Sequence, residues 1–152
     1  MDEELNYEAL RDKASRYYHQ IGKIICPALE NEYVHFTSAG FKHLIFKGNF
    51  SKRNKKEQIA RFKLLPLAVR MVRLATIYQE IDQAIQKITD EEKLVYYWCL
   101  AGILDKRKIK VIIRQVGENE PKHFWSVIPD WISNKRRDIK FAATMEADET
   151  GD

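Results

Sequence analysis

Cysteine is scarce in this sequence, and the two that occur, Cys26 and Cys99, stand far apart among apolar neighbours. They form neither a CxxC pair nor the framework typical of small secreted proteins, so we expect both to be reduced core thiols. No apolar run approaches the roughly 18–20 residues of a membrane-spanning helix. The acidic first four residues also lack the pattern of a secretory signal. The sequence therefore predicts a soluble, cytoplasmic protein with no membrane partner.

Several signatures of enzyme families are missing as well. The sequence has no Walker loop, no GxGxxG after a predicted strand, no HExxH, no GxSxG and no zinc-ligand spacing. Between residues 33 and 77 the only carboxylate is Glu57, so metal ligands are scarce there. The patterns of NTPases, dinucleotide enzymes, zinc proteases and serine hydrolases are thus absent, and we expect neither a metal nor another cofactor.

Positive charge is unevenly distributed, although the net charge is only +4. Residues 1–32 carry 4 basic and 7 acidic side chains, residues 33–137 carry 21 and 10, and residues 138–152 carry 1 and 5. A basic middle of this kind attracts the phosphates of a polyanion, because each phosphate contact releases bound counterions. We therefore expect RNA as a partner. The plainer alternative is a solvated surface that keeps the protein soluble.

The chain has 152 residues, the usual size of one domain, and its hydrophobic spacing changes from helical to alternating halfway along. In the first half we expect an amphipathic helix over 5–25 ending near Gly22, a strand over 32–37, a brief helix capped by Thr37 or Ser38, a basic loop over 46–54, and a long helix from Lys55 that Pro66 ends or divides. In the second half we expect strands over 76–85, 93–104, 108–116 and 123–128.

These elements predict an α+β fold, with N-terminal helices packed on one face of a twisted antiparallel sheet of about four strands. A single domain spans residues 1–152. We divide it into an N-terminal helix over 1–30, a core over 31–132 and a partly disordered acidic tail over 138–152.

Alternation in the last two predicted strands brings cations and an aromatic ring together. In the final strand Phe124, Ser126 and Ile128 share the expected core face, and the residues between them share the open face. The open sheet face then carries Lys108, Lys110, Arg114, His123 and Trp125. Cations for phosphate and a ring for base stacking are what a nucleotide surface needs. Alternatively, Trp125 belongs to the core and His123 only ends a strand.

A second candidate site lies where a predicted strand meets a helix. His35 stands at the strand end beside the positive end of the helix, where anions bind. His43 and Lys42 follow one to two turns later. Two histidines near a phosphate can serve as base and acid. The alternative for His43 is a helix-surface or core histidine, and we interpret His19 as structural.

Basic residues are dense from Lys42 to Arg73, where ten occur. A cluster at the start of the long helix is a ready phosphate clamp. Together with the strand residues, the predicted RNA-binding set is Lys42, Lys52, Arg53, Lys55, Lys56, Arg61, Lys108 and Trp125.

The order of helix, histidine-bearing strand, capped helix, basic helix and antiparallel sheet resembles the toxin-type ribonucleases grouped with barnase, EndoU, colicin D and RelE. In particular it is similar to the phage and mobile-element branch, over about residues 30 to 132. The matching segments are His35-Phe-Thr-Ser-Ala-Gly-Phe-Lys-His43, Lys55-Lys-Glu-Gln-Ile-Ala-Arg61, Lys108-Ile-Lys-Val-Ile-Ile-Arg114 and His123-Phe-Trp-Ser126.

This resemblance implies metal-independent RNA cleavage, often by a toxin that an antitoxin or immunity protein holds in check. We find no glutamate placed like the base of barnase-type enzymes, so a histidine would take that role. The expected reaction is transesterification by a ribose 2′-hydroxyl. We expect His35 as base, His123 or His43 as acid, and Arg114, Lys110 and Arg61 to neutralise charge on the phosphorane, with Ser126 also in the catalytic set.

Two other functions stay open from the sequence. The same basic face could hold RNA or DNA without cutting it, or it could meet an acidic protein partner.

Overall fold

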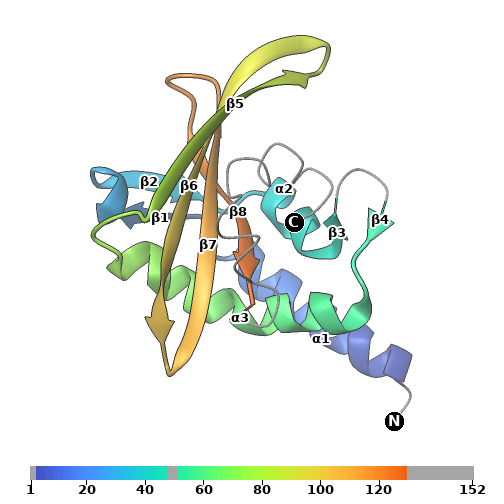
Figure 1. The fold of residues 1–152 in the computed structure, drawn as a ribbon. Coiled ribbons are helices and arrows are strands. Elements are labelled where there is room, and N and C mark those ends of the chain that lie inside the picture. The colour runs from blue at the N-terminus through green and yellow to red at the C-terminus, as the bar shows by residue number, and fades with distance from the viewer. Residues whose placement is uncertain (1–2, 48–50, 130–152) are drawn as a thin grey trace.

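The computed structural model describes residues 3–47 and 51–129 (Figure 1). Within them the fold is α+β, as predicted, with three α-helices, a six-stranded mixed sheet and a separate two-stranded sheet. The acidic tail predicted over 138–152 lies outside the described residues. Among the described helices, none is long and apolar enough to cross a membrane.

The first predicted helix is shorter than expected. Helix α1 spans Glu3–His19, and residues predicted to continue it form strand β1, Lys23–Cys26. Gly22 separates them with φ +71°, a left-handed conformation that glycine adopts without strain. β1 has a strand pattern rather than a helical one, because Ile24 and Cys26 are buried whereas Lys23 and Ile25 are exposed. A short turn of 3₁₀ helix, Pro27–Leu29, then leads to β2, Glu32–His35.

The long helix is continuous through its proline. Helix α2 spans Ser38–Ile45, β3 and β4 are the short strands Phe46–Lys47 and Ser51–Lys52, and α3 spans Lys55–Leu74. The Asn54 side chain caps α3 by accepting the Glu57 backbone N–H at 2.8 Å. The predicted interruption at Pro66 is wrong. Its ring is exposed, and buried apolar residues on both sides pack the whole helix against the sheet despite the missing backbone donor.

The main sheet has more strands than the four predicted. The second half of the chain contributes four strands in which each is antiparallel to the next: β5 (Glu80–Ile88), β6 (Glu91–Leu104), β7 (Arg107–Val116) and β8 (Lys122–Ile128). The order β1-β2-β8-β7-β6-β5 shows that the N-terminal pair joins this sheet through β2 and β8. These two strands run parallel, with Val34 opposite Lys122 and His35 opposite His123.

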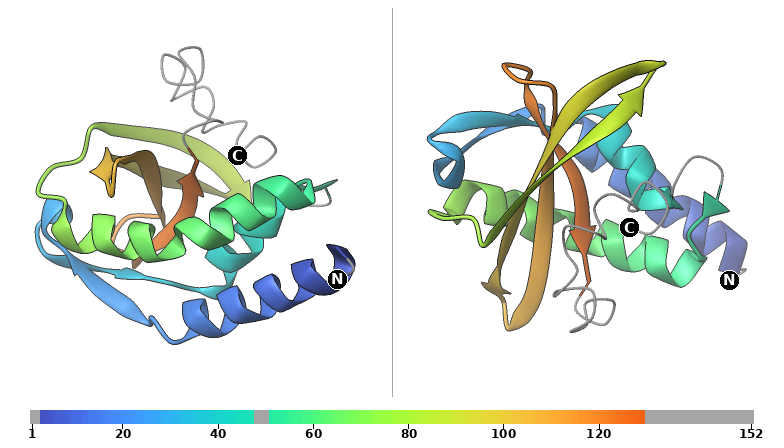
Figure 2. Two further views of the ribbon diagram at one scale, coloured as in Figure 1. Left: turned by 90° about the horizontal axis from the view of Figure 1, so that it is seen from below. Right: turned by 45° about the horizontal axis from the view of Figure 1, so that its top comes forward.

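The main core lies between the helices and one face of the twisted sheet (Figure 2). It joins residues of all three helices to strand residues such as Val34, Val111 and Phe124. A smaller apolar cluster on the opposite face includes Val95, Tyr97, Cys99, Ile112, Trp125 and Ile128. Residues of all three helices therefore contribute to one core on this face, but the predicted antiparallel sheet is wrong, because β2 and β8 are parallel and the sheet is mixed.

A close approach at Gly40 fixes α2 against β8. A Cβ atom at this position would lie 2.5 Å from the Phe124 carbonyl oxygen and 2.5 Å from the Tyr18 hydroxyl. The same hydroxyl donates to the Thr37 carbonyl at 2.6 Å, just before the helix begins. Only glycine permits this packing, which sets α2 beside the strand that carries His123.

Candidate functional site

A row of register partners crosses all six strands of the main sheet. We call it the cross-sheet row, and from β5 to β1 it consists of Asp82, Tyr97, Arg114, His123, His35 and Lys23. Their sequence neighbours Val34 and Phe124 are buried under the helices, so the row lies on the opposite face. Adjacent strands of a sheet are about 4.8 Å apart. The members of the row, all of them polar or ionisable residues, therefore follow one another across the sheet at about this spacing.

A β-bulge in β8 alters the alternation predicted for this strand. Ile112 pairs with Ser126 but Ile113 pairs with Phe124, so Trp125 is the extra residue. Beyond the bulge the faces are exchanged, and Val127 joins Phe124 in the main core while Ile128 joins Trp125 in the smaller cluster. The predicted faces of Val127 and Ile128 were therefore wrong. Trp125 belongs to the smaller cluster and not to the main core, but it is only 7% exposed and packs on His43 of α2.

His35 and His123 meet at an open hollow of about 340 Å³, the histidine hollow. Its lining consists of His35, Thr37, Val116, Glu120, Pro121 and His123. The sequence placed the two histidines in separate candidate sites, and the parallel pairing of β2 with β8 unites them. Arg114 lies opposite His123 on β7, as the alternation predicted. A cation and two imidazoles are thus grouped at one end of the sheet.

Sequence reasoning missed Glu120 in this hollow. It belongs to the turn between β7 and β8, where Gln115 Nε2 donates to the Glu120 carbonyl at 2.7 Å. Glu120 thus adds an acidic residue to the lining of the hollow. The only sequence signal was its position three residues before His123, in a segment interpreted as a simple turn.

Burial lowers the pKa of His123 from 6.5 to about 4. The positive charges of Arg114 and His35 act in the same direction, and a backbone hydrogen bond with Pro121 acts against them. His123 is therefore a neutral imidazole at pH 7, and a neutral imidazole accepts a proton more readily than it donates one. The lowered pKa argues against His123 as the acid, the role expected from the sequence, and leaves it the role of a weak base.

We expect acid to destabilise the fold through His123. Between the ordinary pKa and about 4, the unfolded chain binds a proton that the folded chain does not, so the free energy of unfolding falls as the pH falls. The full effect is on the order of 3 kcal/mol. Urea titrations at about pH 7 and pH 4.5 should show a smaller fall for His123→Asn than for the wild type. Equal falls would show that the histidine is not the cause.

Trp125 joins the histidine hollow to a stack of cationic and aromatic groups. The Arg114 guanidinium carbon is 4.2 Å from the Trp125 ring centroid, and the His43 ring is 4.3 Å away at 27°. Arg114 also donates to the Tyr97 hydroxyl and to Gln86 Oε1, each at 3.2 Å. The guanidinium is thus held in one orientation beside His123.

The structure places His43 differently from the expected catalytic acid. It lies in the last turn of α2, is 5% exposed and packs on Trp125, and it is not among the residues that line the histidine hollow. The alternative of a core histidine describes its position.

Lys110 and Lys108 lie away from the histidines. Lys110 is opposite Ile128, whereas Arg114 is opposite His123, so about 13 Å of strand separates the two cations. Lys110 is also only 7% exposed. Lys108 is exposed near the far end of the same strand. The structure therefore does not bring these lysines to the phosphate position expected for them.

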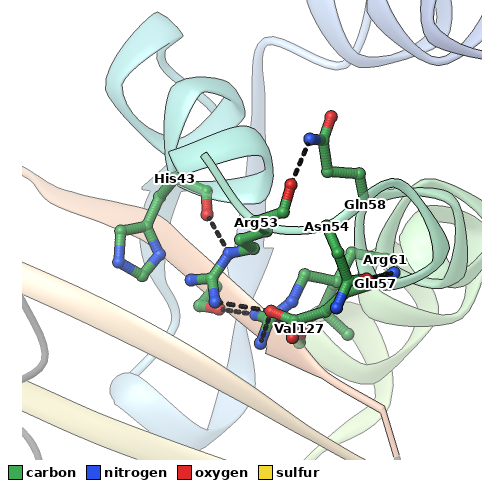
Figure 3. A network of polar contacts seen from close by, with 8 residues as sticks. His43, Arg53, Asn54, Glu57, Gln58, Arg61 and Val127 are labelled. Carbon is green, nitrogen blue, oxygen red and sulfur yellow. Dashed lines mark hydrogen bonds and ion pairs between the residues drawn. The ribbon is translucent and has the colours of Figure 1, made fainter. Parts of the chain in front are cut away.

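Arg53 and Arg61 form a buried charge network with Glu57 (Figure 3). Arg53 Nη1 lies 2.7 Å from Glu57 Oε2 and Arg61 Nη2 lies 3.4 Å from it, and both arginine side chains have no exposed area. Arg53 Nε donates to the His43 carbonyl at 3.0 Å. Arg61 Nη1 donates to Ser126 Oγ at 2.7 Å and to the Val127 carbonyl at 3.0 Å.

This network departs from the expected surface clamp. Glu57, the one carboxylate between residues 33 and 77, compensates the two buried guanidinium groups. Ser126 is fully buried under Arg61, away from the residues of the histidine hollow. The network joins α3 to α2 and β8, so we assign Arg53, Arg61 and Ser126 to the architecture of the site.

The remaining predicted RNA-binding lysines are on the surface. Lys42, Lys52, Lys55 and Lys56 are all exposed, on α2, β4 and the start of α3. The Lys55 ammonium lies 5.2 Å from the Tyr7 ring centroid. These side chains stay candidates for phosphate contacts.

Among residues 3–47 and 51–129, no group of three or more His, Cys, Asp or Glu side chains could hold a metal ion. No family model, curated protein or solved structure matches this chain.

Proposed function

We propose that the protein is an endoribonuclease that cleaves RNA by attack of a ribose 2′-hydroxyl, without a metal ion. The observation that carries the proposal is the pairing of His35 with His123 at one hollow, with Arg114 opposite His123 on the next strand. Two imidazoles and a guanidinium are the groups that this reaction uses as base, acid and charge stabiliser.

In the proposed reaction, neutral His123 removes the proton of the 2′-hydroxyl. The 2′-oxygen then forms a bond to the adjacent phosphorus, and the bond from phosphorus to the 5′-oxygen breaks. Protonated His35 gives its proton to that leaving oxygen. Arg114 stabilises the extra negative charge on the phosphorane, because its orientation is already fixed by Tyr97 and Gln86. The products are a 2′,3′-cyclic phosphate and a 5′-hydroxyl.

The exposed lysines and the basic middle of the chain support RNA as the polyanion that reaches this site. A toxin role with an inhibitory antitoxin or immunity protein stays a prediction from the resemblance. DNA lacks the attacking hydroxyl, so we expect it to bind without being cut.

We expect the purified protein to cleave total RNA in the presence of EDTA and to leave 2′,3′-cyclic phosphate ends. Mapping the ends of the products tests the chemistry, and an oligonucleotide with a single 2′-deoxy residue at the cleaved position should resist. Cleavage that requires an added divalent cation would contradict the mechanism. Salt-sensitive RNA binding without cleavage would instead support the non-catalytic binding module.

A further inference from the structure

A second hollow, the β2 hollow, adjoins the histidine hollow. It has a volume of about 360 Å³ and is lined by Glu32, Tyr33, His35, Asn119, Glu120, Pro121 and Lys122. His35, Glu120 and Pro121 line both hollows, so the two lie side by side. A chain with one phosphate at the histidines therefore has space for a neighbouring group in the β2 hollow.

Tyr33 gives this hollow an aromatic ring. Tyr33 and His35 are two residues apart on β2, so their side chains share one face and their Cα atoms lie about 7 Å apart. Val34 between them is fully buried beneath the helices, which turns both neighbours to the opposite face. The tyrosine is nevertheless 46% exposed. Its ring thus contributes little to the core and is accessible to a ligand.

A cation accompanies this ring. Lys23 lies opposite His35 on β1, and its ammonium is 4.3 Å from the Tyr33 ring centroid. An exposed aromatic ring next to a cation is the combination with which proteins hold single-stranded nucleic acid, since the ring stacks on a base and the cation attracts the backbone. Lys23 is also the last member of the cross-sheet row, so it continues the line of polar groups that contains both histidines.

Polar groups around the β2 hollow can contact the edge of a base. Asn119 has a φ of +67°, a conformation that asparagine tolerates, and its amide offers both donors and an acceptor. Glu120 is a further polar residue of the lining, as are Glu32 and Lys122, whose side chains form an ion pair with 2.5 Å between Oε2 and Nζ. A nucleobase in this hollow would therefore meet hydrogen-bonding groups at its edge and the Tyr33 ring at its face.

We propose that the β2 hollow is a subsite for one unpaired nucleobase next to the scissile phosphate, with Tyr33 as its stacking platform and Lys23 near the backbone. The identity of the ligand rests on the proposed ribonuclease function. A base paired within a duplex cannot turn its face to a protein side chain, so the subsite makes the enzyme selective for single-stranded RNA.

Tyr33→Ala tests the platform, with Tyr33→Phe as the conservative variant. Tyr78→Ala is the matched control, because Tyr78 is 42% exposed and lies just before β5, at the far edge of the sheet. We expect Tyr33→Ala to raise KM for single-stranded RNA by about tenfold or more, the usual effect of losing one stacked base. Tyr33→Phe and Tyr78→Ala should stay near wild type, and thermal unfolding should be unchanged in all three.

An abasic substitution locates the base. With the wild-type protein, removing the base beside the cleaved bond should raise KM by the same factor as Tyr33→Ala does with the intact substrate. Tyr33→Ala acting on the abasic substrate should show no larger rise in KM than either change alone. Wild-type KM in Tyr33→Ala, or full additivity of the two changes, would overturn the subsite. Selectivity for single strands that persists in Tyr33→Ala would do the same.

The proposed function and the subsite can fail separately. If the wild type cleaves no RNA, the ribonuclease proposal fails, and equilibrium binding of the intact and abasic oligonucleotides to the same variants decides the subsite. Discrimination between the oligonucleotides that is lost only in Tyr33→Ala supports it. Equal discrimination in Tyr33→Ala and Tyr78→Ala overturns it.

Discussion

Replacing His35 or His123 by alanine is expected to lower the rate of RNA cleavage by about two orders of magnitude or more, the usual effect of losing a general acid or base. The pairing of β2 with β8 places both imidazoles at one hollow, so each change removes one of two proton-transfer groups from the same phosphate. Single-turnover rates on an oligonucleotide, with binding measured separately, give the effect on chemistry. RNA affinity should change little.

His19→Ala is the matched control for these variants. His19 is exposed at the end of α1, and Ser15 accounts for its hydrogen bonds, so its loss should leave the rate unchanged. Because the two site histidines act in one reaction, the double variant should be far less impaired than the product of the single effects. Wild-type rates in both single variants would return His35 and His123 to structural roles. A large effect of Glu120→Gln together with an active His123→Ala would move the base to Glu120.

Glu57→Ala is expected to destabilise the fold by about 3–5 kcal/mol, because it leaves two buried guanidinium groups without their carboxylate. The backbone N–H of residue 57 still reaches the Asn54 cap, so the helix start is preserved. Urea unfolding of the variant and the wild type measures the loss. Glu8→Ala, at an exposed position on α1, should stay within about 0.5 kcal/mol of wild type.

A second change distinguishes lost charge compensation from lost packing. Adding Arg53→Met to Glu57→Ala removes one of the uncompensated cations and fills similar volume with an apolar chain, so part of the stability should return. If the double variant is less stable than Glu57→Ala by the full effect of Arg53→Met alone, the network does not act as a charge unit.

Local sequence signals predicted most elements but not the way the two halves meet. Alternating residues identified β6, β7 and β8, and the Asn54 cap precedes the helix predicted from Lys55. Nothing local in Glu32–His35 specifies that this strand pairs with β8, because only two register pairs join them and they are far apart in sequence. The sequence therefore identified His35 and His123 as separate candidates but could not predict that they lie next to each other.

Two further errors have specific physical causes. The bulge at Trp125 adds one residue to β8, and period-2 alternation cannot anticipate where such an insertion occurs. Arg53 and Arg61 belong to a run of basic residues that composition assigns to the surface. Their burial depends on Glu57, which lies four residues from each at the start of α3, together with the His43 and Val127 carbonyls from other elements. The spacing of four residues is compatible with the ion pairs to Glu57, but it does not indicate the backbone carbonyls that accept from the two arginines.

The parallel pairing of β2 with β8 also determines when during synthesis the protein can act. Among the described residues β8 is the last strand of the sheet along the chain, and a chain is synthesised from its N-terminus. Until residues 122–128 have been made and have left the exit tunnel, His35 lacks its partner His123. The proposed nuclease is therefore inactive toward the message from which it is being translated until β8 has been synthesised and has paired with β2.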